Sequence, residues 1–279
     1  IEGHKIRSLP GFGEKSEELL AKGLELLSTS KGRMLLGDAL PVAESIVKKL
    51  LQGGMVEKAL IAGSTRRMRE TVGDIDILAI SKKGKEVMDF FSSIDDVESV
   101  IVKGDTKTTV WLKIGLSCDL RVIAPESFGA ALQYFTGNKE HNIKVRKIAI
   151  KKGYKLNECG LFDKKGKIIP FSGEESIYEK LGMQYMPPEM REDRGEVELS
   201  LEHKIPKLVE LSDIRGDLHT HTKETDGANT IEEMADAAVA LGREYFATTN
   251  HTKSLKIAHG MDDAHFVEFF DRIDKLNDK

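Results

Sequence analysis

Two aspartates separated by a single residue are the first sign of chemistry in this sequence. Asp74 and Asp76 open a stretch, residues 74–80, whose early alternation of polar and apolar side chains is typical of a β-strand. Residues two apart in a strand point to the same face, so the two carboxylates project together. Like charges that close raise each other's pKa unless a cation lies between them. Because both ligands are carboxylate oxygens, the pair predicts a site for Mg²⁺ or Mn²⁺ rather than zinc.

A third carboxylate, Asp119, lies among apolar residues in a second predicted strand, residues 117–123. On a neighbouring strand it would stand beside the first pair. Three aspartates can hold two metal ions roughly 3.5–4 Å apart for an in-line displacement. In that arrangement one ion activates a hydroxyl, and the other binds a nucleoside triphosphate and neutralises the leaving pyrophosphate. The three carboxylates therefore predict nucleotidyl transfer.

Small and basic residues upstream of the pair could bind the phosphates. Gly63 and Ser64 come first, followed by Arg67 and Gly73. Glycine lets backbone N–H groups approach phosphate oxygens, a serine hydroxyl can donate a hydrogen bond, and arginine adds a bidentate cation. Alone, a paired aspartate or a Gly-Ser dipeptide is a weak signal that often marks a solvated strand edge. In this order and spacing they favour a phosphate-binding metal site.

The whole segment from Gly63 to Leu78 resembles the palm motif of the family X DNA polymerases, the group that includes DNA polymerase beta. The resemblance implies that Asp74, Asp76 and Asp119 bind the two metal ions. It also implies that the palm binds the nucleotide through Arg33, Gly63, Ser64, Arg67 and Gly73. The sequence departs from DNA polymerase beta at Ser117, where that protein has an arginine.

A second segment, Tyr134-Phe135-Thr136-Gly137, resembles the thumb segment that shapes the nucleotide pocket in the same family. By that resemblance the region of Tyr134 and Phe135 packs near the sugar and rejects a 2′-hydroxyl. Asn142 would contact the incoming base in the minor groove, and Arg146 would contact the template strand. The alternative for the two aromatic residues is an ordinary core pair at a helix end.

Near the start of the chain, residues 9–16 form a glycine-punctuated stretch that resembles the hairpin of a helix-hairpin-helix element. Its DNA-binding residues would be Gly11, Gly13 and Lys15. Backbone amides and a helix N-terminus can hold a DNA phosphate there without reading sequence. An ordinary glycine-rich helix start is the alternative.

The last part of the chain resembles the start of a polymerase and histidinol phosphatase (PHP) domain. The resemblance implies that His219, His221, Asp226 and His251 form part of a site for Mn²⁺ or Zn²⁺. Asn250 departs from the family pattern, which has aspartate there. Because the remaining ligands of such a site would lie beyond residue 279, we expect this chain alone to lack the metal-dependent 3′–5′ exonuclease or phosphoesterase activity of the full domain.

These motifs predict an α+β protein whose palm is a mixed sheet with two helices on one face. The predicted parts, in chain order, are a helix-hairpin-helix or fingers remnant at 1–36, a nucleotidyltransferase palm at 37–124, a thumb of helices and a small sheet at 125–190, a linker at 191–213 and a truncated PHP domain, the start of an α/β barrel, at 214–279. The chain begins with isoleucine and stops soon after the last motif opens, so we expect a fragment of a longer protein.

Spacing of apolar residues and turn signals places the individual elements. In the first 190 residues, strands are predicted at 56–62, 74–80, 97–102, 107–114 and 117–123, a hairpin at 161–169, and helices up to about 27 and at 41–51, 85–91, 126–135, 138–152 and 174–181. Farther on, a strand up to 218, a helix at 231–241 and a strand at 245–249 are predicted.

Composition excludes some classes of protein and leaves others open. Charged residues make up 32% of the chain, and no run of about 18 apolar residues occurs, so a soluble cytoplasmic monomer without a membrane partner is expected. The two cysteines, Cys118 and Cys159, are expected to be reduced. The net charge of -4 does not itself indicate nucleic-acid binding, but residues 139–155 are locally basic.

Three functions remain open at this point. The first is template-directed DNA polymerisation for gap filling in repair, with gapped or primer–template DNA and deoxynucleoside triphosphates as partners. The second is a non-templated nucleotidyltransferase, which would share the Gly-Ser and paired-aspartate motifs but not the thumb segment. The third is an inert DNA-binding module, against which three clustered aspartates argue.

Overall fold

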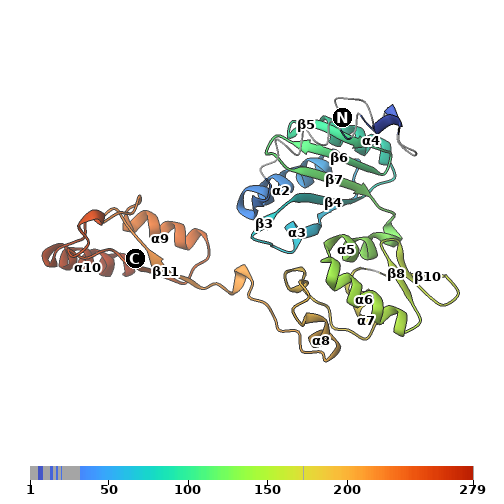
Figure 1. Ribbon diagram of the computed structural model, residues 1–279. Helices are drawn as coiled ribbons and strands as arrows, with labels where there is room; N and C mark the ends of the chain where they lie inside the picture. The colour runs from blue at the N-terminus through green and yellow to red at the C-terminus, as the bar shows by residue number, and fades with distance from the viewer. Residues whose placement is uncertain are drawn as a thin grey trace. The chain divides into compact units, whose positions relative to one another are not determined.

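The computed structural model describes residues 6–8, 13–14, 17, 20, 32–171 and 173–278 (Figure 1). The chain divides into two compact units, Ile1–Ile205 and Pro206–Lys279, which are treated separately below. The predicted N-terminal helix lies mostly outside the described residues. Within the part of the chain that is described, no helix combines the length and the apolar character needed to cross a bilayer.

A five-stranded sheet forms the centre of the palm, in the order β2-β4-β7-β6-β5. Its strands are β2 (Lys58–Ile61), β4 (Asp74–Ile80), β5 (Val97–Lys103), β6 (Lys107–Leu112) and β7 (Ser117–Val122). β4 and β7 run parallel and every other neighbouring pair is antiparallel. The predicted mixed sheet is therefore confirmed, and the strand ends lie within two residues of those read from the sequence.

Two helices, α2 (Leu36–Gln52) and α4 (Gly84–Ser93), cover one face of this sheet. Ile75 and Ile77 of β4 are fully buried in the core that these helices share with the sheet. Because side chains alternate along a strand, Asp76 between them must turn to the opposite face. The apolar core thus fixes which face of the sheet carries the carboxylates.

The thumb follows the palm in the chain and packs directly against it. Its helices are α5 (Phe128–Thr136), α6 (Lys139–Lys151) and α7 (Glu175–Lys180), and its small antiparallel sheet is β8 (Lys155–Asn157), β9 (Gly160–Phe162) and β10 (Ile168–Ile169). Asn138 caps α6, since its side chain accepts a hydrogen bond from the His141 N–H at 2.8 Å. The segment between the two longer helices is therefore held as a tight corner.

One helix occurs where the sequence predicted a linker. Helix α8 (Glu196–Leu201) buries Val197 in the thumb core, and Glu196 accepts a hydrogen bond from the buried His141 ring at 2.8 Å. The residues following Arg191 consequently pack as part of the first unit. The exact boundaries of the five predicted domains stay predictions.

Several short elements accompany those described above, and the sequence predicts one of them, a short helix following a turn within residues 63–69. β1 (Met34–Leu35) pairs with β3 (Thr71–Val72) beside the palm sheet. A one-turn helix, α3 (Gly63–Arg66), follows β2. Single 3₁₀ turns are η1 (Ile6–Ser8), η2 (Pro125–Ser127), η3 (Pro188–Met190), η4 (Leu211–Asp213) and η5 (Lys256–Ala258).

The second unit contains a parallel pair of strands joined by a helix. Its elements are β11 (Gly216–Thr220), α9 (Ile231–Ala240), β12 (Tyr245–Thr248) and α10 (Asp263–Asn277). A capping box between Thr230 and Glu233 starts α9, and Ile231, Met261 and Phe269 form a small core. This strand–helix–strand unit is compatible with the predicted start of a barrel, which stays a prediction.

A buried ion-pair network joins the palm to the thumb. Glu174, 3% exposed, accepts hydrogen bonds from Arg66 of α3 at 2.8 Å and from the fully buried Arg191. Burial alone would raise the pKa of Glu174, but the Arg191 and Arg66 guanidiniums hold it below its usual value. The rings of Tyr178 and Tyr185 each lie 5.2 Å from the Arg191 guanidinium carbon. Glu174 is therefore the shared anion of two cations from different domains.

Replacing that anion should destabilise the first unit. Glu174→Gln is expected to lower the free energy of unfolding by about 3 kcal/mol at neutral pH, because it leaves Arg191 buried without a counter-charge. Since the folded-state pKa of Glu174 is depressed, its contribution is present above the unfolded pKa of about 4.5 and is lost as pH falls below it. Urea unfolding between pH 3 and 7 checks both points: the variant should show the weaker pH dependence. Equal stability of the two proteins at pH 7 would contradict the expectation.

Candidate functional site

Asp74, Asp76 and Asp119 come together on the face of the palm sheet that the helices leave open. The parallel pairing of β4 with β7 sets Asp76 opposite Asp119 and Asp74 opposite Ser117. The sequence prediction that the third aspartate stands beside the first pair therefore agrees with the register. Three carboxylates on two adjacent strands offer oxygen ligands only, which suits hard divalent cations such as Mg²⁺ or Mn²⁺.

Asp76 lies in the least favourable electrostatic position of the three. Burial, together with the negative charges of Asp74 and Asp119, raises its pKa from the ordinary value of 3.8 to about 7. Gly63 packs directly against it, with φ at +62°, and any side chain at Gly63 would collide with the Asp76 carboxylate. Crowded, like-charged oxygens behind a glycine form the kind of cradle that a divalent cation neutralises.

Asp119 already has partners within the protein. Its Oδ1 accepts a hydrogen bond from the Thr109 hydroxyl at 2.5 Å. Its Oδ2 forms ion pairs with Lys107 at 2.9 Å and with Arg121 at 3.1 Å. The Arg121 guanidinium carbon in turn lies 4.5 Å from the centre of the Phe135 ring. Asp119 is thus oriented by neighbours on β6 and β7. None of these neighbours is among the site residues predicted from the sequence.

A pocket of about 370 Å³ lies in front of the β4 carboxylates. The palm contributes Asp74 and Asp76 from β4, and the start of α3 adds further lining. The sequence-predicted residues that line it are Gly63, Ser64, Arg67, Asp74, Asp76, Tyr134, Phe135, Gly137, Asn142 and Arg146. Side chains predicted to bind metal, phosphate, sugar, base and template therefore share one cavity.

The aromatic pair of the thumb segment occupies one wall of this pocket. Tyr134 and Phe135 are half-buried and meet edge to face, with ring centroids 5.2 Å apart. Phe135 also packs against the small apolar cluster between α5 and the palm sheet. The two aromatic residues accordingly have both a packing role and a place at the pocket.

Asn142 lines the pocket but uses its amide inside the protein. Its Oδ1 accepts from the Gln133 side chain and its Nδ2 donates to the Tyr134 carbonyl, each at 2.7 Å. These two bonds fix α6 against the end of α5. The predicted contact of Asn142 with an incoming base stays a prediction, and the structure adds that the side chain is already held in place.

Several predicted site residues lie elsewhere. Arg33 lies next to Gly73, where it donates a hydrogen bond to the Thr71 hydroxyl at 2.9 Å, and neither Arg33 nor Gly73 lines the pocket. Of the predicted DNA-binding hairpin, Gly11 and Lys15 lie outside the described residues. Gly13 is described, and its carbonyl accepts from a helical N–H four residues on, as at an ordinary helix start.

Two further residues line the pocket: Asn138, which the sequence prediction does not include, and Lys139, which it places in the locally basic strip 139–155 as a candidate contact for template phosphates. They directly follow the Tyr-Phe-Thr-Gly segment, at the start of α6. Their position between two predicted site residues, Gly137 and Asn142, was the signal that could have identified them as pocket residues. The exposed Lys139 and Arg146 give this side of the pocket positive charge.

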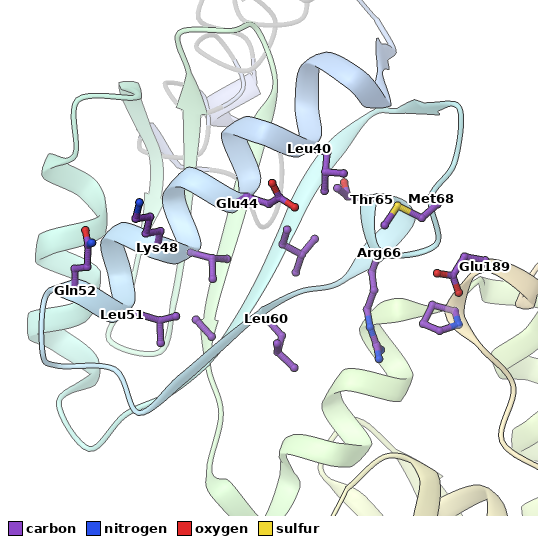
Figure 2. A pocket seen from close by; sticks show the side chains of 14 residues that line it. Leu40, Glu44, Lys48, Leu51, Gln52, Leu60, Thr65, Arg66, Met68 and Glu189 are labelled. Atoms are coloured by element: carbon purple, nitrogen blue, oxygen red, sulfur yellow. The ribbon is translucent and has the colours of Figure 1, made fainter. Parts of the chain in front are cut away.

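A larger groove, of about 610 Å³, lies between α2, β2 and α3 (Figure 2). Leu40, Leu51, Leu60 and Met68 give it mainly apolar walls, and none of the sequence-predicted site residues lines it. The pocket at the carboxylates is therefore the candidate active site of the first unit, although it is the smaller of the two.

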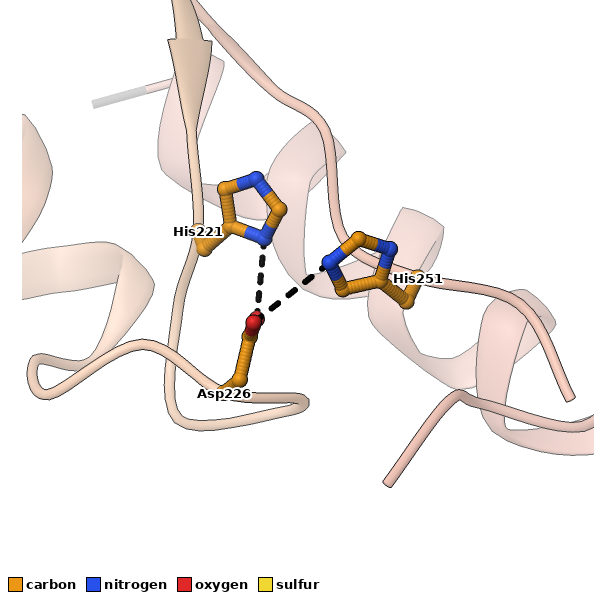
Figure 3. A group of neighbouring side chains, drawn as sticks. All are labelled: His221, Asp226 and His251. Carbon is orange, nitrogen blue, oxygen red and sulfur yellow. Dashed lines mark hydrogen bonds and ion pairs between the residues drawn. The ribbon is translucent and has the colours of Figure 1, made fainter. Parts of the chain in front are cut away.

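In the second unit, His221, Asp226 and His251 converge (Figure 3). Their ligand atoms all lie within 4.8 Å of one another, with His221 Nδ1 at 2.9 Å and His251 Nε2 at 3.4 Å from the Asp226 carboxylate. His219 is adjacent, 3.1 Å from His221 between ring nitrogens. Two imidazoles and a carboxylate at this spacing form a donor set for Mn²⁺ or Zn²⁺.

The residues around this cluster explain its geometry. Asn250 accepts from the Thr222 N–H and donates to the Thr222 hydroxyl, each at 2.8 Å, so its amide ties the end of β12 to the loop after β11. A side chain at Gly227 would collide with the His221 carbonyl. Asn250 and Gly227 therefore shape the loop that carries Asp226, whereas the ligands themselves are the neighbouring residues.

A lone thiol lies directly behind the palm carboxylates. Cys118 of β7 is fully buried in the palm core, and burial together with the nearby aspartates raises its pKa well above the ordinary value. Cys159, in the thumb turn between β8 and β9, is exposed. Neither cysteine lines the candidate site.

Comparison with known proteins identifies the relatives of this chain. A family model described as DNA polymerase beta thumb matches residues 131–192. DNA polymerase/3′-5′ exonuclease PolX of Bacillus subtilis (strain 168) is 38% identical over 279 residues, which is 99% of this chain and 49% of that protein. The chain thus spans about half the length of this relative.

Proteins of African swine fever virus and Leishmania infantum match a smaller part of the chain. Repair DNA polymerase X of African swine fever virus (isolate Tick/South Africa/Pretoriuskop Pr4/1996) is 32% identical over 146 residues, 49% of this chain and 83% of the viral protein. Crystal structures of Leishmania infantum polymerase beta, as ternary P/T and ternary gap complexes, superpose with a TM-score of 0.56 at 22% and 20% identity. They cover 67% of this chain and 86% and 78% of theirs, which shows the shared fold. With the palm carboxylates, the thumb and these sequence identities taken together, the chain belongs to the family X DNA polymerases.

Proposed function

We propose that this chain is a template-directed DNA polymerase that adds deoxynucleotides to the 3′-hydroxyl of a primer and fills short gaps during DNA repair. The observation that carries the proposal is the pocket in which Asp74 and Asp76 face Ser64 and Arg67, with Asp119 on the adjoining strand. The printed names of the Bacillus and viral relatives, a DNA polymerase and a repair DNA polymerase, support it.

The donor set fits two divalent metal ions, Mg²⁺ or Mn²⁺, held by Asp74, Asp76 and Asp119. Such ions, when bound, activate the primer hydroxyl and neutralise the leaving pyrophosphate. The raised pKa of Asp76 and the absence of a side chain at Gly63 support this assignment, since both reflect a place for a cation among crowded oxygens.

The remaining pocket residues would bind and orient the substrates. The Ser64 hydroxyl and the Arg67 guanidinium are placed to hold the triphosphate. Tyr134 and Phe135 form the wall beside the sugar, and Gly137 keeps that wall close. The exposed cations Lys139 and Arg146 would contact phosphates of the DNA, a largely sequence-independent attraction.

The two other candidate functions are less well supported. A non-templated nucleotidyltransferase would not need the thumb, whereas a thumb model matches residues 131–192. An inert DNA-binding module would have no use for three aspartates whose mutual repulsion destabilises the metal-free protein. The Leishmania structures, a ternary P/T complex and a ternary gap complex, support DNA as the partner.

The second unit supports a separate proposal. We infer that His219, His221, Asp226 and His251 are part of a metal-dependent phosphoesterase site, which in a longer protein would act as a 3′–5′ exonuclease. The specific observation is the convergence of His221, Asp226 and His251, together with the exonuclease in the Bacillus relative's name.

Substituting one central carboxylate tests the polymerase proposal. Asp76→Asn is expected to lower the rate of primer extension on a one-nucleotide-gapped duplex by at least roughly a hundredfold, because the amide cannot hold the cation. The variant should be at least as stable as the wild type without metal, since one of three crowded like charges is gone. Extension assays with Mg²⁺ or Mn²⁺ and thermal unfolding measure the two effects.

Asp95→Asn makes the same chemical change at an exposed position outside the pocket, and it should extend the primer normally. Normal extension by the Asp76 variant would remove Asp76 from the metal site. Failure of the wild type to extend any primer, with DNA still bound, would favour the DNA-binding module.

Metal binding and nuclease activity should separate in the second unit. We expect the chain to bind Mn²⁺ and to lose much of that binding in Asp226→Asn, because Asp226 joins both histidines. We expect no Mn²⁺-dependent 3′–5′ exonuclease activity from the chain itself, since its described cluster supplies too few ligands for the several ions such a site needs. Calorimetric Mn²⁺ titration and degradation of a labelled single strand measure these outcomes; robust degradation that is lost in Asp226→Asn would contradict the second.

A further inference from the structure

Glu192 lies beside the pocket, in the segment that packs back from the thumb onto α3. Its side chain is largely buried, and its two oxygens serve different domains. Oε1 accepts a hydrogen bond from Arg67 Nε at 2.7 Å, and Oε2 accepts from the Asn138 side chain at 3.2 Å. Arg69 Nε lies 3.7 Å from Oε1. One carboxylate thus joins the palm arginine to the capping residue of α6.

These contacts fix the orientation of Arg67. Its Nε is bound to Glu192, and its Nη1 donates to the Thr136 carbonyl at 2.5 Å. Gly137 closes the side next to Nη1, since a Cβ there would come within 3.2 Å of it. Among the described residues, Nη2 has no hydrogen-bond partner, and Arg67 lines the pocket. The guanidinium is therefore anchored through Nε and Nη1, and Nη2 keeps its donors for a ligand.

We propose that Glu192 is a positioning residue, which holds Arg67 in the orientation that binds the triphosphate of the incoming nucleotide. This inference rests on the proposed function and extends it to a residue outside the palm motif. A planar guanidinium can donate from Nε to a carboxylate while Nη2 donates to a phosphate, so the two anions do not compete for the same donor.

Two consequences distinguish this role from a simple ion pair. A long arginine side chain that is already held loses less conformational freedom when the nucleotide binds, which favours affinity. In addition, Glu192 connects Arg67 to Asn138, whose other amide atom caps α6, the helix that carries Asn142 and Arg146. The phosphate-binding and base-side walls of the pocket are therefore linked through one side chain.

The test is nucleotide affinity in the 279-residue chain bound to primer–template DNA. Glu192→Ala is expected to weaken binding of a non-hydrolysable deoxynucleoside triphosphate about tenfold. The KM for the nucleotide should rise accordingly and kcat should change less. The reason is that Arg67, held by Glu192, binds the triphosphate in the ground state as well as in the transition state. The loss should be similar for all four bases, since the Arg67 guanidinium that Glu192 holds is placed to bind phosphate, which all four nucleotides share.

Glu192→Gln keeps an acceptor oxygen of the same size, so its loss should be smaller than that of Glu192→Ala. Glu189→Ala is the matched control, because Glu189 is an exposed glutamate three residues upstream that does not line the pocket. Thermal unfolding of every variant identifies an effect that comes from destabilisation alone.

A double-mutant cycle decides whether Glu192 acts through Arg67. In an Arg67→Ala background, removal of Glu192 should have no further effect on affinity. Unchanged or tighter nucleotide binding in Glu192→Ala, or fully additive effects in the cycle, would overturn the inference while leaving the polymerase proposal intact. A wild-type chain that neither binds the nucleotide nor extends a primer would overturn the proposed function and this inference with it.

Discussion

The arrangement of the first unit depends on the ion pairs that the buried carboxylate of Glu174 forms with two arginines. A charge in a protein interior is tolerated only when it is paired and hydrogen-bonded, and two arginines from different domains satisfy it. Arg66 belongs to the same single-turn helix that begins with Gly63 and Ser64. Any shift of that helix relative to the thumb would leave buried charges unpaired, so the turn at Gly63 and Ser64 and the aromatic pair of α5 stay in register.

The palm sheet adds a second constraint, in which packing holds like charges together instead of pairing opposite charges. Its apolar residues require burial against α2 and α4, and the period of the strand then forces the aspartates onto the other face. Asp119 is partly neutralised by Lys107 and Arg121, whereas Asp76 has no cation bonded to it within the described chain. Packing free energy thus maintains an electrostatically unfavourable cluster, and the cluster is useful because it attracts cations.

Elements and site residues could be predicted from the sequence where the pattern that indicates them is local. Strand β4 was predicted with its observed ends because the alternation of Asp74 and Asp76 with isoleucines is a local pattern. Glu192 was missed because its partners are distant in sequence. Glu192 and Arg67, for example, are separated by 125 residues.

Arg191 shows why a local rule can fail. It lies in a charged run, residues 191–196, at which the sequence predicts the start of a linker. Its counter-charge lies 17 residues upstream, and only the folded thumb brings the two together beneath a pair of tyrosine rings. Charge composition alone does not distinguish a buried ion pair from an exposed one.

The contrast between the two cysteines has a practical consequence for spectroscopy. Cys118 is enclosed in the palm core with a thiol that stays protonated, whereas Cys159 projects from a thumb turn. In the folded chain a maleimide dye would therefore attach at one position without any engineering, since thiolate and access together determine the reaction. The sequence already supplies a single attachment point on the thumb for a spectroscopic label.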